Sequence, residues 1–329
     1  MLEHGGNLHD AARTFGRALE TWVDLSTGLN PHGYPAPTLA PHVWHRLPQA
    51  DPALLDAARR FYGMPSVLAV AGTQAAIQAL PALRPPSRVV VAAPSYAEHA
   101  HHWSRHGHVM RQVAYADLKG ALKECDVMVL CNPNNPTGAT IPADQLLQWS
   151  RSLRARGGWL VVDEAFGDLA PELSVARWSG QPGLVVLRSV GKFFGLAGIR
   201  AGFVGAHEDL LAALAALLGP WPLTGPSQLI ARAALDDLAW QAQARKSLAV
   251  SGARMQDLLV RHDIKVTGTP LFHWWPEDQP EAFWRYMAER GILVRLFTQA
   301  ARGIRVGLPA TDEEWARFER ALNDWNRKT

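Results

Sequence analysis

One lysine lies in a segment whose residue types could support covalent chemistry on a phosphorylated molecule. Lys192 stands between Gly191 and Phe193, three positions after Ser189 and eight before Arg200. Apolar surroundings disfavour its charged form, so the amine can act as a nucleophile. Serine and arginine both suit a phosphate, which a guanidinium binds through paired donors. A reactive amine beside a phosphate clamp is what pyridoxal phosphate requires, although a glycine-rich turn with a surface lysine would show the same pattern.

The junction Gly72-Thr73-Gln74 is a second candidate anion site, because it lies between an apolar run and a helical pattern. Backbone N–H groups in the first turn of a helix point towards an anion, and the helix dipole adds to the attraction. Thr73 could instead cap the helix in the ordinary way. Together with the serine and arginine of the lysine segment, the junction would complete a three-part phosphate site.

Further polar residues follow other apolar runs. The turn 132–138 contains two prolines, a glycine and more asparagines than a turn needs. Asp163 and Glu164 end another run, and side-chain alternation allows only one of them to point into a site, which leaves the other to face a partner or solvent. Asp163 could also belong to a structural ion pair. Tyr96 follows a third run, where a half-buried core tyrosine is the simpler interpretation.

Between residues 67 and 205, short apolar runs alternate with helical patterns. Runs of this kind predict a mainly parallel sheet that is covered on both faces. The polar motifs follow the ends of the runs, where open α/β sheets bind ligands. The predicted strands are 67–71, 88–93, 109–115, 127–131, 159–163, 184–189 and 201–205. The predicted helices between them are 74–83, 97–107 and 142–156.

After about residue 224 the pattern changes to that of a smaller α+β domain. A long helical pattern at 227–261 comes first. It is followed by predicted strands at 264–267, 271–275, 292–297 and 303–308 and predicted helices at 280–290 and 311–327.

Composition excludes several classes of function. The 329 residues are 48% hydrophobic and 19% charged, as in ordinary globular proteins, and the net charge of +3 is scattered rather than gathered in a basic run. Nucleic-acid binding is therefore disfavoured. Two cysteines cannot form a disulfide framework, and no metal-ligand spacing occurs. Neither a signal peptide nor a membrane-length apolar segment is present, so we expect a cytoplasmic protein without a membrane partner.

From about residue 30 to residue 305, the motifs and their order resemble the aspartate-aminotransferase superfamily, the class I and II, fold-type I enzymes that use pyridoxal phosphate. The resemblance implies an α/β, PLP-dependent transferase fold with a large domain over 49–224 and a smaller one over 225–329. Residues 1–48 would join the smaller domain. A homodimer is also implied, because active sites of this fold type generally form between two subunits.

The resemblance also implies a role for each motif. Lys192 would bond to the cofactor's aldehyde, Asp163 would pair with its ring nitrogen and Asn135 with its phenolic oxygen. Tyr96 would stack on the ring. The phosphate would be bound by Gly72, Thr73, Gln74, Ser189 and Arg200.

Two positions depart from the pattern of the aminotransferase relatives. Phe166 stands where many of them have a tyrosine whose hydroxyl also contacts the phenolic oxygen. Leu47 stands where histidinol-phosphate aminotransferases usually have a tyrosine that reaches the neighbouring subunit's cofactor phosphate. Each departure removes a hydrogen bond and leaves the other cofactor contacts in place.

The N-terminal tract resembles the threonine-phosphate decarboxylases of cobalamin biosynthesis through His4-Gly5-Gly6-Asn7 and the later Asn30-Pro31. This resemblance implies that His4, Gly5 and Asn30 contact the substrate, as would Asn135. A disordered tail is the alternative for His4, because chain termini usually fray.

Two arginines near the C-terminus are candidates for binding substrate anions. Arg295 and Arg305 each stand in an apolar run, where an arginine is rarely buried without an anion. The family resemblance implies that these two arginines bind the substrate's carboxylate and its second anionic group. Arg302 is close enough in sequence to Arg305 to be an alternative.

The expected activity is decarboxylation of L-threonine O-3-phosphate, a phosphorylated amino acid, to (R)-1-amino-2-propanol O-2-phosphate. The first alternative is a transaminase that acts on histidinol phosphate. The second is a non-catalytic protein of this fold with a regulatory or partner-binding role.

Overall fold

A computed structural model describes residues 4–299 and 301–326, and the chain folds into two compact units. The larger unit contains residues 33–135 and 139–242, and the smaller contains 1–32, 136–138 and 243–329. These units are not identical to the domains expected from the sequence at 1–48, 49–224 and 225–329, and those domain limits stay predictions.

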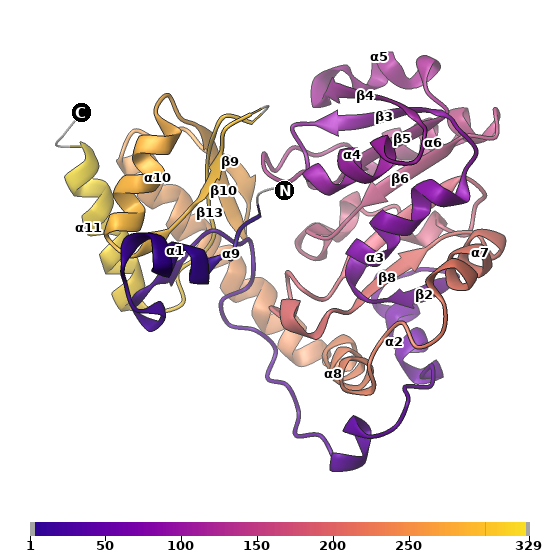
Figure 1. Ribbon diagram of the computed structural model, residues 1–329, viewed down its shortest axis with the longest axis horizontal. Helices are drawn as coiled ribbons and strands as arrows, with labels where there is room; N and C mark the ends of the chain where they lie inside the picture. Colours follow the sequence, from indigo (N-terminus) through magenta and orange to yellow (C-terminus); the bar gives the residue numbers. More distant parts are fainter. Residues whose placement is uncertain (1–3, 300, 327–329) are drawn as a thin grey trace. The chain divides into compact units, whose positions relative to one another are not determined.

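The larger unit is built on a seven-stranded sheet in the order β2-β8-β7-β6-β5-β3-β4 (Figure 1). Five strands, β3 to β7, run parallel to their neighbours, whereas β8 is antiparallel to both β7 and β2. The mainly parallel sheet predicted from the apolar runs is therefore confirmed. The strands are β2 (Val67–Val70), β3 (Arg88–Ala93), β4 (Val109–Ala114), β5 (Val127–Cys131), β6 (Trp159–Asp163), β7 (Leu184–Ser189) and β8 (Gly202–Gly205).

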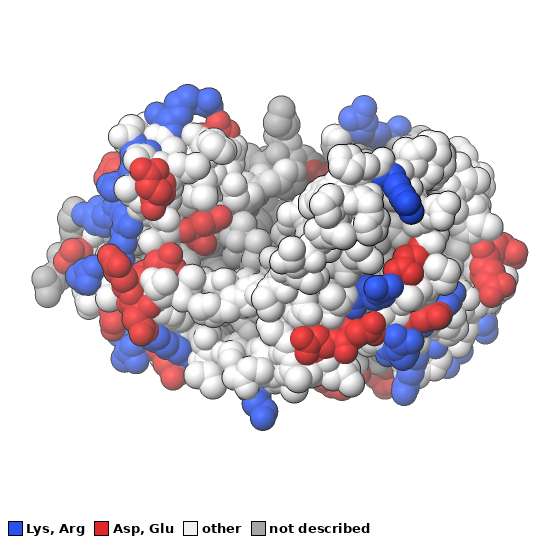
Figure 2. All heavy atoms as spheres, turned by 90° about the horizontal axis from the view of Figure 1, so that it is seen from below, with Lys and Arg blue, Asp and Glu red and all other residues white. Residues whose placement is uncertain are grey.

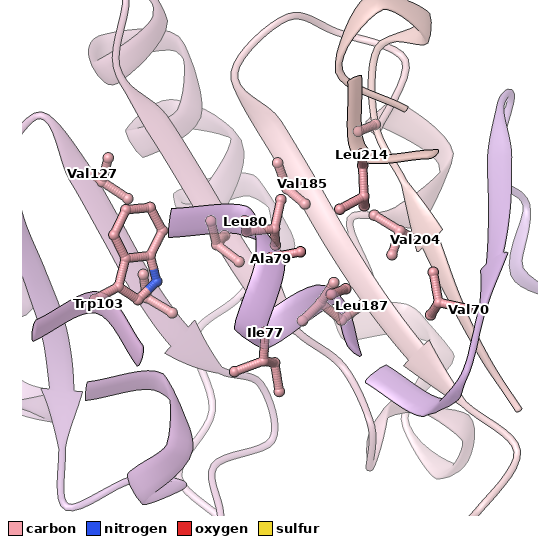
Figure 3. Close-up of a cluster of buried hydrophobic side chains, with 14 of the residues drawn as sticks. Val70, Ile77, Ala79, Leu80, Trp103, Val127, Val185, Leu187, Val204 and Leu214 are labelled. Carbon is pink, nitrogen blue, oxygen red and sulfur yellow. The ribbon is translucent and has the colours of Figure 1, made fainter. Parts of the chain in front are cut away.

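Both faces of this sheet are covered, because side chains on both sides of a strand are buried. In β5, Val127 and Val129 belong to one core cluster, while Met128 and Leu130 between them are also fully buried. Figure 3 shows strand side chains of that cluster beside side chains of α3 and of the turn that follows it. The helices of the unit are α2 (Pro52–Tyr62), α3 (Gly72–Ala79), α4 (Ala97–Ser104), α5 (Leu118–Ala121), α6 (Ala143–Arg154), α7 (Glu208–Leu218) and α8 (Gly225–Asp236).

The register of the parallel strands aligns their carboxyl ends. Cys131 of β5 pairs with Asp163 of β6, and Asp163 pairs with Leu187 of β7. A side chain at the end of any of these strands is thus beside the ends of its neighbours, at the edge where parallel sheets bind ligands.

The sheet also carries a buried ionic cluster centred on Arg188 of β7. The Nη1 of Arg188 donates to Glu164 at 2.8 Å and its Nη2 to Asp168 at 2.5 Å, and all three residues are buried. Ser174 and the backbone N–H of Val175 also donate to Glu164. Glu164 therefore faces a buried cation, and the sequence-based alternative that it faces solvent is wrong.

The smaller unit joins the N-terminal segment to the C-terminal part of the chain. Strand β1 (Val23–Asp24) pairs in parallel with β11 (Ile292–Leu293), and Trp22 packs with Ala288 in a shared cluster. A separate antiparallel sheet has the order β12-β13-β10-β9. Its strands are β9 (Thr267–Thr269), β10 (Phe272–Pro276), β12 (Arg295–Phe297) and β13 (Gly303–Val306), and the nearby helices are α1 (Leu8–Phe15), α10 (Pro280–Glu289) and α11 (Asp312–Asn326).

The single helix predicted over 227–261 is two helices, α8 and α9 (Leu238–Arg261). Asp237 leaves the helical conformation, with φ −86° and ψ 82°, and its carboxylate accepts from the backbone N–H of Trp240. The side chain of Gln241 donates to the carbonyls of Ala234 and Leu235. One side chain thus caps the start of α9, and the other satisfies carbonyls at the end of α8.

Two predicted strands of the smaller unit also differ from the structure. The strand predicted at 264–267 begins at Thr267 and ends at Thr269. The strand predicted at 292–297 divides into β11 and β12, because its two halves pair with different partners, β1 and β13. Apolar patterning cannot show this change of partner.

The distribution of surface charge and the length of the helices can be described for the part of the chain that the structure covers. Acidic and basic side chains are interspersed on the face shown in Figure 2. Among the described residues, no helix has both the length and the apolar character that crossing a lipid bilayer requires.

Replacement of Arg188 by methionine should destabilise the larger unit strongly. Without the guanidinium, two buried carboxylates would lose their cation, at a cost of about 3–5 kcal/mol in the free energy of unfolding. Urea unfolding followed by circular dichroism measures this loss. Arg111→Met is the matched control, because Arg111 pairs with Glu124 at the surface, where both side chains are more than half exposed and an ion pair contributes about 0–1 kcal/mol. Equal effects of the two substitutions would contradict the role of the buried cluster.

Candidate active site

A cavity lies at the carboxyl ends of β5, β6 and β7 in the larger unit, where Cys131, Asp163 and Ser189 end the three strands. Nine residues that the sequence motifs selected for cofactor binding all line this cavity. They are Gly72, Thr73, Gln74, Tyr96, Asn135, Asp163, Ser189, Lys192 and Arg200. Motifs spread over more than a third of the chain thus converge on one place.

One end of the cavity has the groups that an anion requires. Helix α3 begins at Gly72, and no side chain caps its N-terminus, so the interpretation of Thr73 as a routine cap is wrong. Gly72 has φ +70°, and a Cβ there would come within 2.8 Å of the Arg200 Nη2. The guanidinium therefore lies directly against the start of α3, and the positive φ of Gly72 favours glycine at this position. Together with Ser189, these groups form a site suited to a phosphate.

Lys192 is half-buried in the loop that follows β7. Its Nζ lies 5.4 Å from the centre of the Phe166 ring, and Phe166 itself is buried. The surroundings of the lysine are therefore partly apolar, as the sequence predicted, and the surface lysine of the alternative interpretation is wrong. Phe166, one of the two departures from the family pattern, lines the same cavity as the amine.

Asp163 is buried and has two hydrogen bonds. Its Oδ1 accepts from the backbone N–H of Ala165 at 3.0 Å, and its Oδ2 lies 2.9 Å from the Nε2 of His99 in α4. Burial alone would lower the pKa of His99, but its contacts with Asp163 and Cys131 raise that pKa to about 10. An imidazolium thus faces the carboxylate at neutral pH. Asp163 is in a buried ion pair, and it also lines the cavity.

The sequence reasoning did not select His99. The available signal was its position three residues after Tyr96, which puts both near one face of a helix. Residues 99–108 include five histidines, however, and their types and spacing do not show which of them reaches Asp163.

The three asparagines of the turn after β5 have different tasks. Asn132 closes the turn through two hydrogen bonds with the backbone of Ile141, at 2.8 and 3.0 Å. Asn134 donates to the carbonyl of Pro94 at 2.9 Å. Asn135 is half-buried and lines the cavity, so it is the asparagine of the turn that can meet a ligand.

Tyr96 precedes α4 and is held at the cavity by a polar network. Its hydroxyl donates to Gln74 at 3.2 Å, and the amide of Gln74 donates to Glu98 at 2.5 Å. His102 contacts the same carboxylate oxygen of Glu98 at 3.0 Å. Burial, followed by the charge of Glu98, raises the pKa of Tyr96, so the tyrosine stays neutral. Its ring is available as a wall of the cavity.

Arg305 and Arg295, the candidates for substrate anions, belong to the smaller unit and stand directly opposite each other on β13 and β12. Arg305 is buried, and its Nη2 donates to the carbonyl of Ser26 at 2.9 Å. Burial, and next the charge of Arg295, lower the pKa of Arg305, while Asp24 raises it. A bound anion would oppose both unfavourable effects.

Arg302, the alternative to Arg305, has a different environment. It is exposed, and its guanidinium lies 3.3 Å from Glu281. Water and Glu281 already solvate and pair with the Arg302 guanidinium, so a substrate anion would stabilise it little. Arg305 is therefore the better candidate.

The N-terminal substrate candidates are anchored on the smaller unit as well. The backbone N–H of Gly6 donates to Ser26 Oγ at 2.7 Å, and a Cβ on Gly5 would lie 2.4 Å from the Ser26 carbonyl oxygen. Glycine at position 5 is thus a steric requirement. His4 is exposed, while Asn30 is buried and accepts from the backbone N–H of His32. Gly5 and Gly6 of the tract therefore lie against Ser26, while the role of His4 stays a prediction.

Comparisons with known proteins agree with this arrangement. The family model "Aminotransferase class I and II" matches residues 20–321. The chain is 47% identical to a threonine-phosphate decarboxylase of Pseudomonas aeruginosa over 98% of this chain and 97% of that protein. It is 41% identical to a threonine-phosphate decarboxylase of Sinorhizobium sp. over 93% of each.

Among solved structures, the chain is similar to the histidinol-phosphate aminotransferase of Sinorhizobium meliloti in complex with pyridoxal-5'-phosphate. The TM-score is 0.83 and the identity 22%, with 99% of this chain and 96% of that chain covered. The likeness shows a common fold, and the predicted fold class is confirmed.

The pair of His99 and Asp163 should make stability depend on pH in the alkaline range. The pKa of His99 rises from 6.5 to about 10 on folding. Its contribution is therefore complete below pH 6.5 and is lost as the pH rises towards 10, because the unfolded chain releases the proton first. Urea unfolding of the wild type and of His99→Gln between pH 6 and 10 measures this. The difference in unfolding free energy should shrink as the pH rises, and a constant difference would contradict the ion pair.

Proposed function

This chain belongs to the class I and II aminotransferase family, and we propose that it is a pyridoxal-phosphate enzyme that decarboxylates L-threonine O-3-phosphate. The observation that carries the proposal is the convergence of nine motif residues on one cavity in a chain 47% identical to a threonine-phosphate decarboxylase. The product would be (R)-1-amino-2-propanol O-2-phosphate, used in cobalamin biosynthesis.

The residues of the cavity fit pyridoxal phosphate. The N-terminus of α3 at Gly72 and Thr73, with Ser189 and Arg200, would bind the phosphate. Lys192 would bond to the aldehyde, Asp163 would pair with the ring nitrogen, Asn135 would donate to the phenolic oxygen, and Tyr96 would cover the ring. When bound, this group supplies an aldehyde for the substrate's amine and a ring that accepts electrons from the α-carbon.

Asp163 would hold a proton on the ring nitrogen. A carboxylate that is buried and oriented by two hydrogen bonds is ready to accept from a protonated ring without rearrangement. Gln74 and Glu98 would keep Tyr96 in place at the same time.

Asn135 would be the main side-chain donor to the phenolic oxygen. The usual second donor, a tyrosine hydroxyl, is replaced by Phe166, an apolar ring whose centre lies 5.4 Å from the Lys192 Nζ. Phe166 would exclude water from the amine and leave the phenolic oxygen to Asn135.

Arg305 and Arg295 would bind the two anionic groups of threonine phosphate. Their side chains leave paired strands at opposite positions, so two positive charges are available on one sheet. Arg305 would take the carboxylate, because a guanidinium can bind both of its oxygens. The bond that breaks would be the one held perpendicular to the cofactor's ring. His4, Gly5 and Asn30 would complete the substrate site.

A histidinol-phosphate aminotransferase is the second candidate, because the two activities use the same cofactor and the same family of folds. A non-catalytic protein is disfavoured because every cofactor position except Phe166 carries a competent residue. We further propose a homodimer in the cytoplasm, with no nucleic-acid or membrane partner. These proposals rest on the family and on the scattered surface charge.

The reaction can be tested directly with threonine phosphate. Protein reconstituted with pyridoxal phosphate should release carbon dioxide without an amino acceptor, and 2-oxoglutarate should not accelerate the release. Lys192→Ala should abolish it, whereas Lys246→Ala, at an exposed lysine, should retain it. Formation of glutamate from 2-oxoglutarate with histidinol phosphate, without carbon dioxide from threonine phosphate, would instead identify a transaminase.

Arg305→Lys should weaken substrate capture while cofactor binding is unchanged. Lysine cannot reproduce the bidentate contact, so kcat/KM should fall by one to three orders of magnitude, about 1.4 kcal/mol for each. Arg302→Lys is the control, because Arg302 is exposed and paired with Glu281. Loss of the cofactor in Arg305→Lys would assign the residue to the fold. A capture defect in Arg302→Lys alone would move the carboxylate role to Arg302.

A further inference from the structure

Two adjacent tryptophans of β10 differ in what their indole N–H groups contact. Trp275 is buried, and its Nε1 donates to the carboxylate of Glu277 at 3.1 Å. Trp274 is half-buried as a residue, but its Nε1 is buried and has no hydrogen-bond partner among the described residues. Indole N–H groups in the interior usually find an acceptor, so the one at Trp274 calls for an explanation.

The two indoles lie on opposite faces of the four-stranded sheet, because successive side chains of a strand alternate. Trp275 packs against Phe283 of α10, with ring centres 5.6 Å apart. Trp274 therefore stands on the face that turns away from this helix.

The face that carries Trp274 also carries the two arginines proposed to bind the substrate. Trp274 stands directly opposite Arg305 in the pairing of β10 with β13, and Arg305 stands directly opposite Arg295 in the pairing of β13 with β12. Residues in such cross-strand pairs share a face, and neighbouring strands are about 4.8 Å apart. Three side chains whose polar groups can only donate hydrogen bonds thus form one row across the sheet.

The guanidinium of Arg305 has apolar neighbours on both sides of its strand. Its Cζ lies 5.2 Å from the ring centre of Phe272, which shares the Trp274 face of β10, and 6.0 Å from that of Phe297. A further cation here would add to the charge of Arg295, which together with burial, the larger cause, lowers the pKa of Arg305. An indole N–H instead adds a donor without adding charge, and a hydrogen bond in apolar surroundings is stronger than one in water.

We propose that Trp274 is a substrate-binding residue whose indole N–H donates to the carboxylate that Arg305 holds. The proposal rests on the proposed function, because it assumes that the carboxylate of threonine phosphate binds Arg305. A guanidinium takes both oxygens of a carboxylate but leaves each of them a further lone pair. The N–H of Trp274 would fill one of these lone pairs, and the buried donor would gain its missing acceptor.

This contact would make Trp274 distinguish the substrate from the product. Threonine phosphate has the carboxylate, whereas the decarboxylated product keeps the amine and the phosphate and has lost the carboxylate. Binding of the product should therefore be independent of the Trp274 N–H. The residue would favour capture of the substrate without delaying release of the product.

The test uses the enzyme loaded with pyridoxal phosphate and measures kcat/KM for threonine phosphate and the inhibition constant of the product. Trp274→Phe keeps an aromatic ring and removes the N–H. Loss of one hydrogen bond to a charged group should lower kcat/KM about ten-fold, while the inhibition constant of the product is unchanged. Benzothienylalanine in place of Trp274 replaces the N–H by sulfur and keeps the shape of the indole. It should have the same effect, and it decides the question if Trp274→Phe does not fold.

Trp275→Phe is the matched control, because it removes an N–H from the neighbouring residue on the other face of the sheet. It should leave both constants unchanged. Equal weakening of substrate and product in Trp274→Phe would overturn the proposal, because it would show that the indole only shapes the site. No change in either constant would overturn it as well, and so would the same selective loss in Trp275→Phe.

A double-mutant cycle adds a second readout. In an Arg305→Lys background, Trp274→Phe should have a smaller effect on kcat/KM, because both residues would act on the same carboxylate. Additive losses would contradict the shared contact. A wild-type enzyme that binds pyridoxal phosphate but releases no carbon dioxide from threonine phosphate would refute the proposed function itself. That result does not depend on position 274, so the two failures are distinguishable.

Discussion

The parallel register of β5, β6 and β7 is the constraint on which the candidate site depends. Each of these strands is buried on both faces, and a slip of one residue would exchange the Asp163 side chain with that of a core valine. The register therefore aligns the three carboxyl ends at one edge of the sheet. Segments that follow these strands are far apart in sequence, yet they deliver an asparagine, a carboxylate and a lysine to the same cavity.

The second constraint at this edge of the sheet is that buried carboxylates must be paired with cations. Asp163 and Glu164 are adjacent in sequence, yet they contact different elements and different cations, His99 in α4 and Arg188 in β7. Arg188 also pairs with the carboxylate of Asp168, and this buried cluster stabilises the fold. Asp163, the partner of His99, lines the cavity, so this buried ion pair stands at a place where a ligand can bind.

The smaller unit buries a positive charge, that of Arg305, which likewise needs partners. Arg305 is buried opposite another arginine, and the carbonyl of Ser26 accepts from it. The same Ser26 anchors the N-terminal glycines, one of which has no room for a side chain. A tract outside the segment matched by the family model and an arginine within it are thus connected through one residue. Under the proposed function, this connection would let the N-terminal tract contribute to substrate selection.

Much of the fold and of the candidate site followed from the sequence, because both rest on local signals. Continuous apolar runs gave the limits of β3, β5, β6 and β7 to the residue, since strands buried on both faces tolerate few polar side chains. Motifs rich in glycine, proline and asparagine marked the turns after the strands, because such turns have few conformations, and the family resemblance of these motifs selected the cavity residues.

Other features depend on contacts between distant segments. The break at Asp237 comes from capping by polar side chains that a helical pattern also tolerates. The choice of Arg305 over Arg302 is a matter of burial. His99 is one of five histidines in ten residues, and packing of α4 against the sheet is what places it, and not the others, on Asp163.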